Sequence, residues 1–290
     1  MGGSSWSEDS YVRYSASMCK SYDASTKRVT GQVYSQEHLA EILNPKDAIR
    51  ECCISDEHPN PIPVILALDV TGSMGSACQE TAEALGAMMD DLYKKFKDIE
   101  IMVMGIGDFE CDDAPLQAGQ FESDIRISQQ LDKIYMEHGG GGNSYESYSA
   151  AWLFGVDNCK LEPFDKQGRK GIIITMGDEP LNPDLKADQV KAYMGTQRKG
   201  LIKTDALYEE ASKKFDIFHI QVQHGSNYRD AVIEESFGQL LGSRFKKSGV
   251  NGISTTIVEC ITEALENTEP APQKFEEGSD NASNSGEINW

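Results

Sequence analysis

A short apolar segment that ends in a row of oxygen-bearing side chains constrains this chain most. Residues 64–68 read Val-Ile-Leu-Ala-Leu, which is the length and composition of a buried strand. Asp69, Thr71 and Ser73 follow it at alternate positions, and a helical pattern begins after Gly75. Strand, tight polar loop and helix in this order place oxygen ligands at the carboxyl edge of a parallel sheet. One carboxylate and two hydroxyls suit Mg²⁺ and are poor ligands for Zn²⁺.

Strand and helix patterns alternate along most of the remaining chain. Further strands are predicted at residues 99–106, 172–176 and 217–222, and helices at 77–97, 125–137, 145–158, 203–214, around 233–241 and around 253–264. Parallel strands need helical crossovers, so this succession predicts a doubly wound α/β fold with helices on both faces of the sheet. In the strand at 217–222, His219 and Gln221 alternate with apolar residues, which predicts that this strand is less fully buried than the others.

The polar loop after the first strand also carries a family resemblance. Asp69-x-Thr71-Gly-Ser73 resembles the metal-ion-dependent adhesion motif of von Willebrand factor A (vWA) domains, whose usual form is Asp-x-Ser/Thr-x-Ser. The resemblance extends over roughly residues 60 to 266. It implies a Rossmann-like, mostly parallel six-stranded sheet with the strand order 3-2-1-4-5-6. In that order the loops after the first and fourth strands meet at the switch point of the sheet.

Two later loops match the same family in the expected order. The glycine run Gly139–Gly142 precedes Ser144, where the family usually has Gly-Gly followed closely by Thr. The strand at 172–175 runs into Met176-Gly177-Asp178, where Thr-Asp-Gly is the commoner family sequence. The resemblance therefore implies that Asp178 approaches Asp69. Whether Asp178 reaches the ion directly, through water or not at all stays open.

The implied metal site consists of Asp69, Thr71, Ser73, Ser144 and Asp178. Mg²⁺ is the expected ion, although Ca²⁺ or Mn²⁺ would fit the same oxygens. Such a shell leaves one coordination position open, which an Asp or Glu of a partner protein can fill. The alternative reading of the first loop is a plain strand-to-helix turn that uses Asx and Ser caps.

The resemblance also divides the chain into an N-terminal extension (1–60), a vWA domain (61–266) and a disordered acidic tail (267–290). The tail is rich in Glu, Pro, Ser and Asn, a composition typical of disorder. Seven cysteines without a Cys-x-x-Cys spacing indicate reduced thiols in the cytoplasm. No apolar run approaches the length of a transmembrane helix.

The net charge of −20 argues against nucleic acid or an anionic membrane as the main partner. A cation or a basic protein surface fits that charge better, and solubility alone would also explain it. Some vWA domains are components of ribonucleoproteins, which suggests one candidate function, but the acidic balance counts against direct contact with RNA.

The leading functional hypothesis is a non-catalytic, divalent-cation-dependent adaptor or scaffold that binds a protein. The pattern looks like intracellular microbial and phage vWA proteins, and some members of that broader family work beside AAA+ ATPases. The alternative is an enzyme, a Mg²⁺-dependent phosphatase or phosphotransferase with a haloacid-dehalogenase-like fold. Those enzymes need a second Asp, as general acid, two residues after the nucleophile, and here Thr71 occupies that position.

Overall fold

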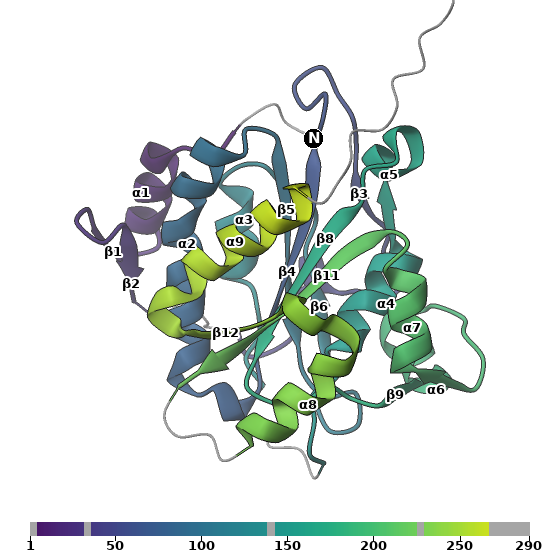
Figure 1. Cartoon of the computed structure of the whole chain (residues 1–290). Helices are drawn as coiled ribbons and strands as arrows, with labels where there is room; N and C mark the ends of the chain where they lie inside the picture. The colour runs from purple at the N-terminus through teal and green to yellow at the C-terminus, as the bar shows by residue number, and fades with distance from the viewer. Residues whose placement is uncertain (1–4, 32–35, 138–142, 225–228, 267–290) are drawn as a thin grey trace, which may run out of the picture.

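The computed structural model describes residues 5–31, 36–137, 143–224 and 229–266. A six-stranded sheet forms its centre (Figure 1). Its strands are β4 (Ile62–Asp69), β5 (Ile99–Ile106), β6 (Leu116–Ala118), β8 (Gly171–Gly177), β11 (Phe215–Gln223) and β12 (Phe245–Gly249). The described helices are α1 (Glu8–Ser17), α2 (Ser76–Lys95), α3 (Arg126–Leu131), α4 (Ser149–Asn158), α5 (Glu162–Gln167), α6 (Ala187–Met194), α7 (Thr204–Ala211), α8 (Asp230–Leu241) and α9 (Ile253–Glu266).

The strands of this sheet lie in the order β12-β11-β8-β4-β5-β6. All neighbouring pairs are parallel except β5 and β6, which are antiparallel. The chain runs from β4 to β5 and β6 on one side and returns to β8 on the other side of β4. The predicted class, a mostly parallel six-stranded α/β sheet with helices on both faces, is thereby confirmed. The direction in which the chain winds along the sheet reverses between β4 and β8.

Both faces of the sheet are apolar, which explains why its long strands read as continuous hydrophobic runs. Along β4, Leu66 and Leu68 belong to one buried layer and Ile65 and Ala67 to the other. Helices α2, α3 and α9 contribute to the first layer, and α4, α6, α7 and α8 contribute to the second. Figure 1 shows α2 and α9 on one side of the strands and α4 and α7 on the other.

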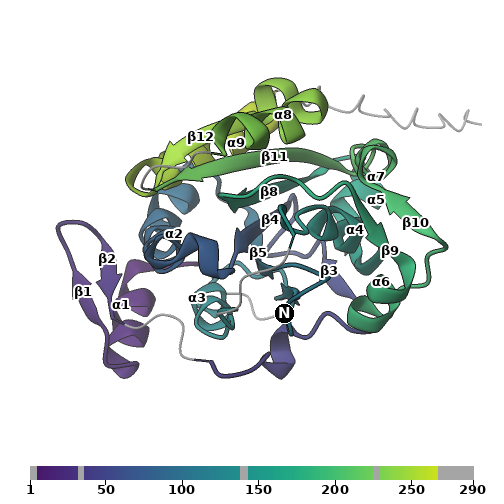
Figure 2. The same ribbon diagram turned by 90° about the horizontal axis from the view of Figure 1, so that it is seen from below.

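Three two-stranded sheets lie outside the main one. They pair β1 (Ser21–Asp23) with β2 (Arg28–Thr30), β3 (Arg50–Cys52) with β7 (Cys159–Leu161), and β9 (Asp184–Lys186) with β10 (Leu201–Lys203). Figure 2 shows β1, β2 and α1 against α2, at the end of the molecule opposite α6.

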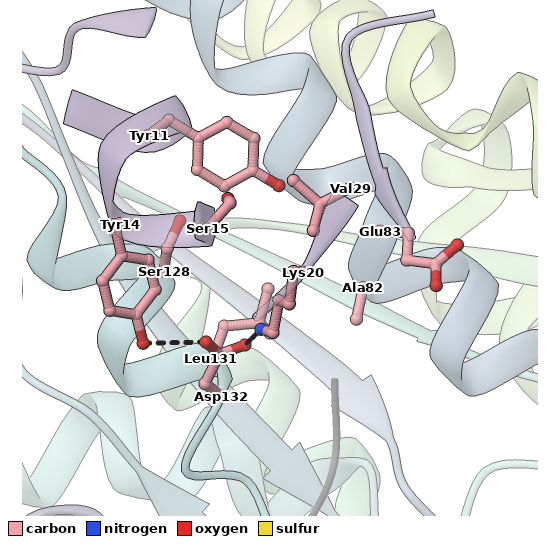
Figure 3. A pocket seen from close by; sticks show the side chains of 10 residues that line it. All are labelled: Tyr11, Tyr14, Ser15, Lys20, Val29, Ala82, Glu83, Ser128, Leu131 and Asp132. Atoms are coloured by element: carbon pink, nitrogen blue, oxygen red, sulfur yellow. Dashed lines mark hydrogen bonds and ion pairs between the residues drawn. The ribbon is translucent and has the colours of Figure 1, made fainter. Parts of the chain in front are cut away.

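The N-terminal segment packs on the sheet's own helices. Trp6 and Tyr11 are buried in the same apolar layer as α2, and the Trp6 indole Nε1 donates to Asp90 Oδ1 at 2.8 Å. Figure 3 shows a small cavity between the N-terminal segment and helices α2 and α3. There the Tyr14 hydroxyl and the Lys20 ammonium both donate to the Asp132 carboxylate. Residues 5–31 therefore share the core, while the division at residue 60 stays a prediction. The predicted acidic tail, 267–290, lies outside the described residues.

The predicted partial exposure of the strand at 217–222 is wrong. His219 and Gln221 are both buried. The His219 ring stacks on Phe237 with 3.6 Å between ring centroids, and its Nδ1 lies 2.9 Å from the Thr175 hydroxyl. The Gln221 amide donates to Asp230 Oδ1 at 2.7 Å. One polar atom of each side chain therefore has a partner on β8 or at the start of α8, while His219 Nε2 and Gln221 Oε1 are buried without a hydrogen-bond partner among the described residues.

We expect Phe237→Ala to lower the free energy of unfolding by about 3–5 kcal/mol, because it removes a fully buried ring and leaves a cavity. Urea unfolding followed by circular dichroism would measure the change. Val232→Ala is the control, since Val232 lies on the same helix but is 53% exposed. A loss for Phe237→Ala no larger than that for Val232→Ala would contradict the packing described here.

Candidate metal centre

Asp69 ends the central strand and is completely buried. Its Oδ1 accepts hydrogen bonds from the Thr71 amide at 2.9 Å and the Thr71 hydroxyl at 2.6 Å. Its Oδ2 accepts one from the Tyr148 hydroxyl at 2.6 Å. The two oxygens of one carboxylate therefore join the loop after β4 to the residue before α4.

The loop after β4 turns sharply so that its hydroxyls face the next strand. It forms a 3₁₀ turn over Gly72–Met74, and Gly75 follows with a positive φ of 48° that favours glycine. The Thr71 and Ser73 hydroxyl oxygens lie 3.1 Å apart. This turn therefore presents two hydroxyl oxygens side by side, immediately before helix α2 begins.

Asp178 follows β8 and lies at the other side of these hydroxyls. Ser73 Oγ donates to Asp178 Oδ1 at 2.8 Å, and His224 Nε2 lies 2.9 Å from Asp178 Oδ2. A continuous chain of polar contacts thus runs from Asp69 through Thr71 and Ser73 to Asp178 and His224. It crosses the carboxyl ends of β4, β8 and β11, where the winding of the sheet reverses.

Four of the five predicted site residues meet in this chain, and the fifth does not. The Ser144 side chain is exposed, and among the described residues no hydrogen bond joins its hydroxyl to the other four. Its backbone carbonyl accepts from the Arg229 guanidinium, which also pairs with Glu179. The predicted glycine run, Gly139–Gly142, lies outside the described residues, so the approach of this loop to the ion stays a prediction.

Gly177 is required by the close packing behind the two carboxylates. A Cβ at this position would lie 2.7 Å from Asp69 Oδ2 and would collide with the Tyr148 hydroxyl. The absence of a side chain at Gly177 therefore leaves room for the hydrogen bond between Tyr148 and Asp69.

Glu146 is a site residue that the sequence did not reveal. Its side chain is 7% exposed, and its buried Oε2 has no hydrogen-bond partner among the described residues. Burial, together with the charges of Asp69 and Asp112, raises its pKa to about 11. In the sequence this residue precedes a helix and resembles a capping residue. His224, which follows a strand, carried no ligand spacing that would have singled it out.

Negative charge exceeds positive charge around this chain of contacts. Burial first, and the charge of Asp178 second, raise the pKa of Asp69 to about 7. Asp108, at the end of the neighbouring strand β5, is also buried and accepts a hydrogen bond from the Asn143 side-chain amide at 2.5 Å. Three buried carboxyls and the unpartnered oxygen of Glu146 make this a place where a bound cation would relieve electrostatic cost.

The donor set fits a hard divalent cation. No group of three or more His, Cys, Asp or Glu side chains in the described ranges is arranged to hold a metal. A site here would depend on hydroxyl oxygens and waters beside two carboxylates, which is a shell that Mg²⁺ accepts and Zn²⁺ does not favour. Thr71 and Ser73 would supply the direct oxygens, and Asp69 and Asp178 would accept hydrogen bonds from waters on the ion.

Comparison with known proteins gives weak likenesses only. No protein-family model and no curated protein sequence matches the chain. Among solved structures, the pilus adhesin SpaC of Lactobacillus rhamnosus GG in its open conformation is 9% identical with a TM-score of 0.49, over 72% of this chain and 30% of that one. The vWF domain of the type V pili tip protein Mfa5 of Porphyromonas gingivalis is 10% identical with a TM-score of 0.49, over 74% of this chain and 99% of that one.

Proximal thread matrix protein 1 from the mussel byssus is 12% identical with a TM-score of 0.44, over 71% of this chain and 46% of that one. The chain spans less than a third of the length of SpaC, the first structure named above. With TM-scores below 0.5, these likenesses establish neither family membership nor function. In the part of the chain that the structure describes, no helix is both long and apolar enough to cross a bilayer.

In metal-free protein, we expect Asp178→Asn to raise the free energy of unfolding by about 1 kcal/mol above pH 7. The pKa of Asp69 is raised in the folded state, so the free energy of unfolding falls as Asp69 ionises between about pH 4 and pH 7. Part of that loss comes from repulsion by Asp178. Urea unfolding in EDTA at pH 5 and pH 8 would measure it. Asp205→Asn, at an exposed position, is the control. A destabilised Asp178→Asn variant at pH 8 would contradict the described repulsion.

Proposed function

We propose that this chain is a non-catalytic, vWA-type protein-binding domain that holds a divalent cation at the Asp69–Asp178 site. The observation that carries the proposal is the chain of polar contacts from Asp69 through Thr71 and Ser73 to Asp178, built from two loops that are distant in sequence. A plain capped turn would need only the first loop. The junction of the two loops at the switch point of the sheet supports a site for an ion.

The chain's own residues leave one side of this site for a partner. Thr71 and Ser73 would turn their lone pairs to Mg²⁺, while Asp69 stays fixed by Tyr148 and would orient water rather than bind directly. Ser144 would approach from the loop that Arg229 holds by its carbonyl. Because the protein then neutralises the ion only in part, a carboxylate from an Asp or Glu of the partner completes the shell.

The partner's carboxylate also meets positive charge at the rim of the site. His224 contacts Asp178, and Arg229 bridges Glu179 and the Ser144 carbonyl. The Arg229 guanidinium is a positive charge beside the loop of Ser144 in a protein of net charge −20, so it marks the rim as the place for an acidic group. We propose a protein partner of this kind, with an AAA+ ATPase as one candidate, and neither nucleic acid nor membrane as a ligand.

The proposal places the protein in the cytoplasm. Cys52, Cys159 and Cys260 are buried as thiols, which supports a reducing compartment. A catalytic role as a haloacid-dehalogenase-like phosphatase is not supported, because the residue two positions after Asp69 is Thr71, whose hydroxyl donates to Asp69 and cannot act as a carboxylic acid.

We expect Mg²⁺ to stabilise the protein, by about 1.4 kcal/mol at a concentration tenfold above Kd. Thermal unfolding with and without EDTA would measure this stabilisation. Ser73→Ala should weaken the apparent affinity for Mg²⁺ at least tenfold, because the variant loses a direct oxygen ligand. Ser76→Ala is the matched control, since Ser76 is an exposed serine three residues further along the chain. Equal Mg²⁺ responses in wild type and Ser73→Ala would contradict the site.

We expect capture of the protein partner to require both the ion and the motif. Tagged wild-type protein would be incubated with native-host lysate in Mg²⁺ or in EDTA, and the captured proteins identified by mass spectrometry. Asp69→Ala combined with Ser73→Ala should lose the Mg²⁺-dependent partner, while Ser76→Ala keeps it. Unchanged capture by the double variant and in EDTA would contradict the proposal. Mg²⁺-dependent phosphatase turnover that vanishes in Asp69→Asn would favour the enzyme instead.

A further inference from the structure

A second pocket lies far from the candidate metal centre. It has a volume of about 420 Å³ and is half open to solvent, and Ile42, Arg50, Gln120 and Gln130 are among its lining residues. Residue 122, also in its lining, pairs with Ile101 near the start of β5, whereas the metal site adjoins the other end of the sheet. A pocket of this volume is within the range that holds a small organic ligand.

Arg50 gives this pocket a positive charge that no carboxylate of the described residues neutralises. Its guanidinium Nη2 donates to the backbone carbonyls of Ile42, Asn44 and Ala118, at 3.1, 3.3 and 2.8 Å. Its Nε is buried without a hydrogen-bond partner, and no described acidic side chain forms an ion pair with it. A half-buried cation without a counter-charge is costly in a folded protein, so an anion at this position would be favoured.

Two glutamines add further donors. Gln120 Oε1 accepts from the Glu51 and Phe121 amides at 3.1 and 2.9 Å, and Gln130 Oε1 accepts from the Gln120 amide at 2.6 Å. These contacts fix the orientation of both side-chain amides, because a backbone N–H can only face the oxygen. The NH₂ groups are therefore left as donors without a partner among the described residues, and the Gln130 side chain is 7% exposed.

The remaining lining residues neither neutralise Arg50 nor fill the pocket. Glu122 pairs with Arg126 at 2.8 Å, a guanidinium that it shares with Asp124, and no described ion pair joins Glu122 to Arg50. Ile42, which is 54% exposed, provides an apolar wall beside the polar donors. The pocket lining thus combines hydrogen-bond donors that have no partner among the described residues with the apolar side chain of Ile42.

We propose that this pocket binds a small carboxylic acid with a short apolar tail. A carboxylate would accept hydrogen bonds from Arg50 Nη1, which donates to no described residue, and from the flanking glutamine amides. The alkyl chain would lie against Ile42. This site is independent of the metal centre, and its ligand would bind whether or not Mg²⁺ is present.

The test uses hexanoate as the probe, with the full-length protein in EDTA, and measures binding by isothermal titration calorimetry. Hexanoate should bind, while hexylamine of the same chain length and inorganic phosphate should bind at least about tenfold more weakly. Arg50→Gln should weaken hexanoate binding by a similar factor. Arg169→Gln is the matched control, because Arg169 also donates to a backbone carbonyl but lies outside the pocket.

Because Arg50 braces three carbonyls, a second variant avoids any loss of folding. Gln129→Glu places a negative charge at an exposed position of the pocket lining and should also weaken hexanoate binding about tenfold or more. Absence of hexanoate binding by the wild type would overturn the proposal. Equal binding of hexylamine, stronger binding of phosphate, or undiminished hexanoate binding by Gln129→Glu would overturn it as well.

Discussion

The buried carboxylate of Asp69 is the interaction on which the arrangement of the site depends. It stands at the end of the central strand, completely removed from solvent, and each of its oxygens holds a different loop. A buried carboxylate is tolerated only when its lone pairs are satisfied, so the turn after β4 and the start of α4 are drawn to the same point. The nearby carboxylate of Asp178 adds a second negative charge, and its repulsion contributes to the raised pKa of Asp69.

The sequence predicted the fold class and the meeting of Asp69, Thr71, Ser73 and Asp178, because both follow from continuous apolar runs and from the topology of parallel strands. It could not predict β6 and β12 as strands. Gln117 interrupts the short β6, and β12 reads Phe-Lys-Lys-Ser-Gly, so neither shows the apolar pattern of a covered strand. Both strands lie at edges of the sheet: β12 is only partly buried, whereas β6 is fully buried but only three residues long, too short to show a pattern.

The parts of the site that the sequence missed depend on contacts between distant segments. His219, which lies on a strand predicted to be less fully buried, is covered because Phe237 of α8 stacks on its ring. His224 lies beside Asp178 because it directly follows β11, and Glu146 precedes α4, where its backbone amide donates to the carbonyl of Pro180 in the loop after β8. Arg50, in the short strand β3, gave no signal in the sequence. Its carbonyl acceptors come from two separate segments, around residues 42–44 and at Ala118, and no acidic partner is present among the described residues.

The tight fit behind the two aspartates links residues that are distant along the chain. Gly177 has no room for a side chain because the phenol of Tyr148 fills the space that a Cβ would need. In homologous sequences, these two positions should consequently evolve together: a side chain at 177 requires a smaller residue at 148 and also a shift of the Asp69 carboxylate, whose Oδ2 would lie 2.7 Å from the added Cβ. Such an exchange would release the hydroxyl's grip on Asp69, so lineages that vary here would be expected to have remodelled or abandoned the ion.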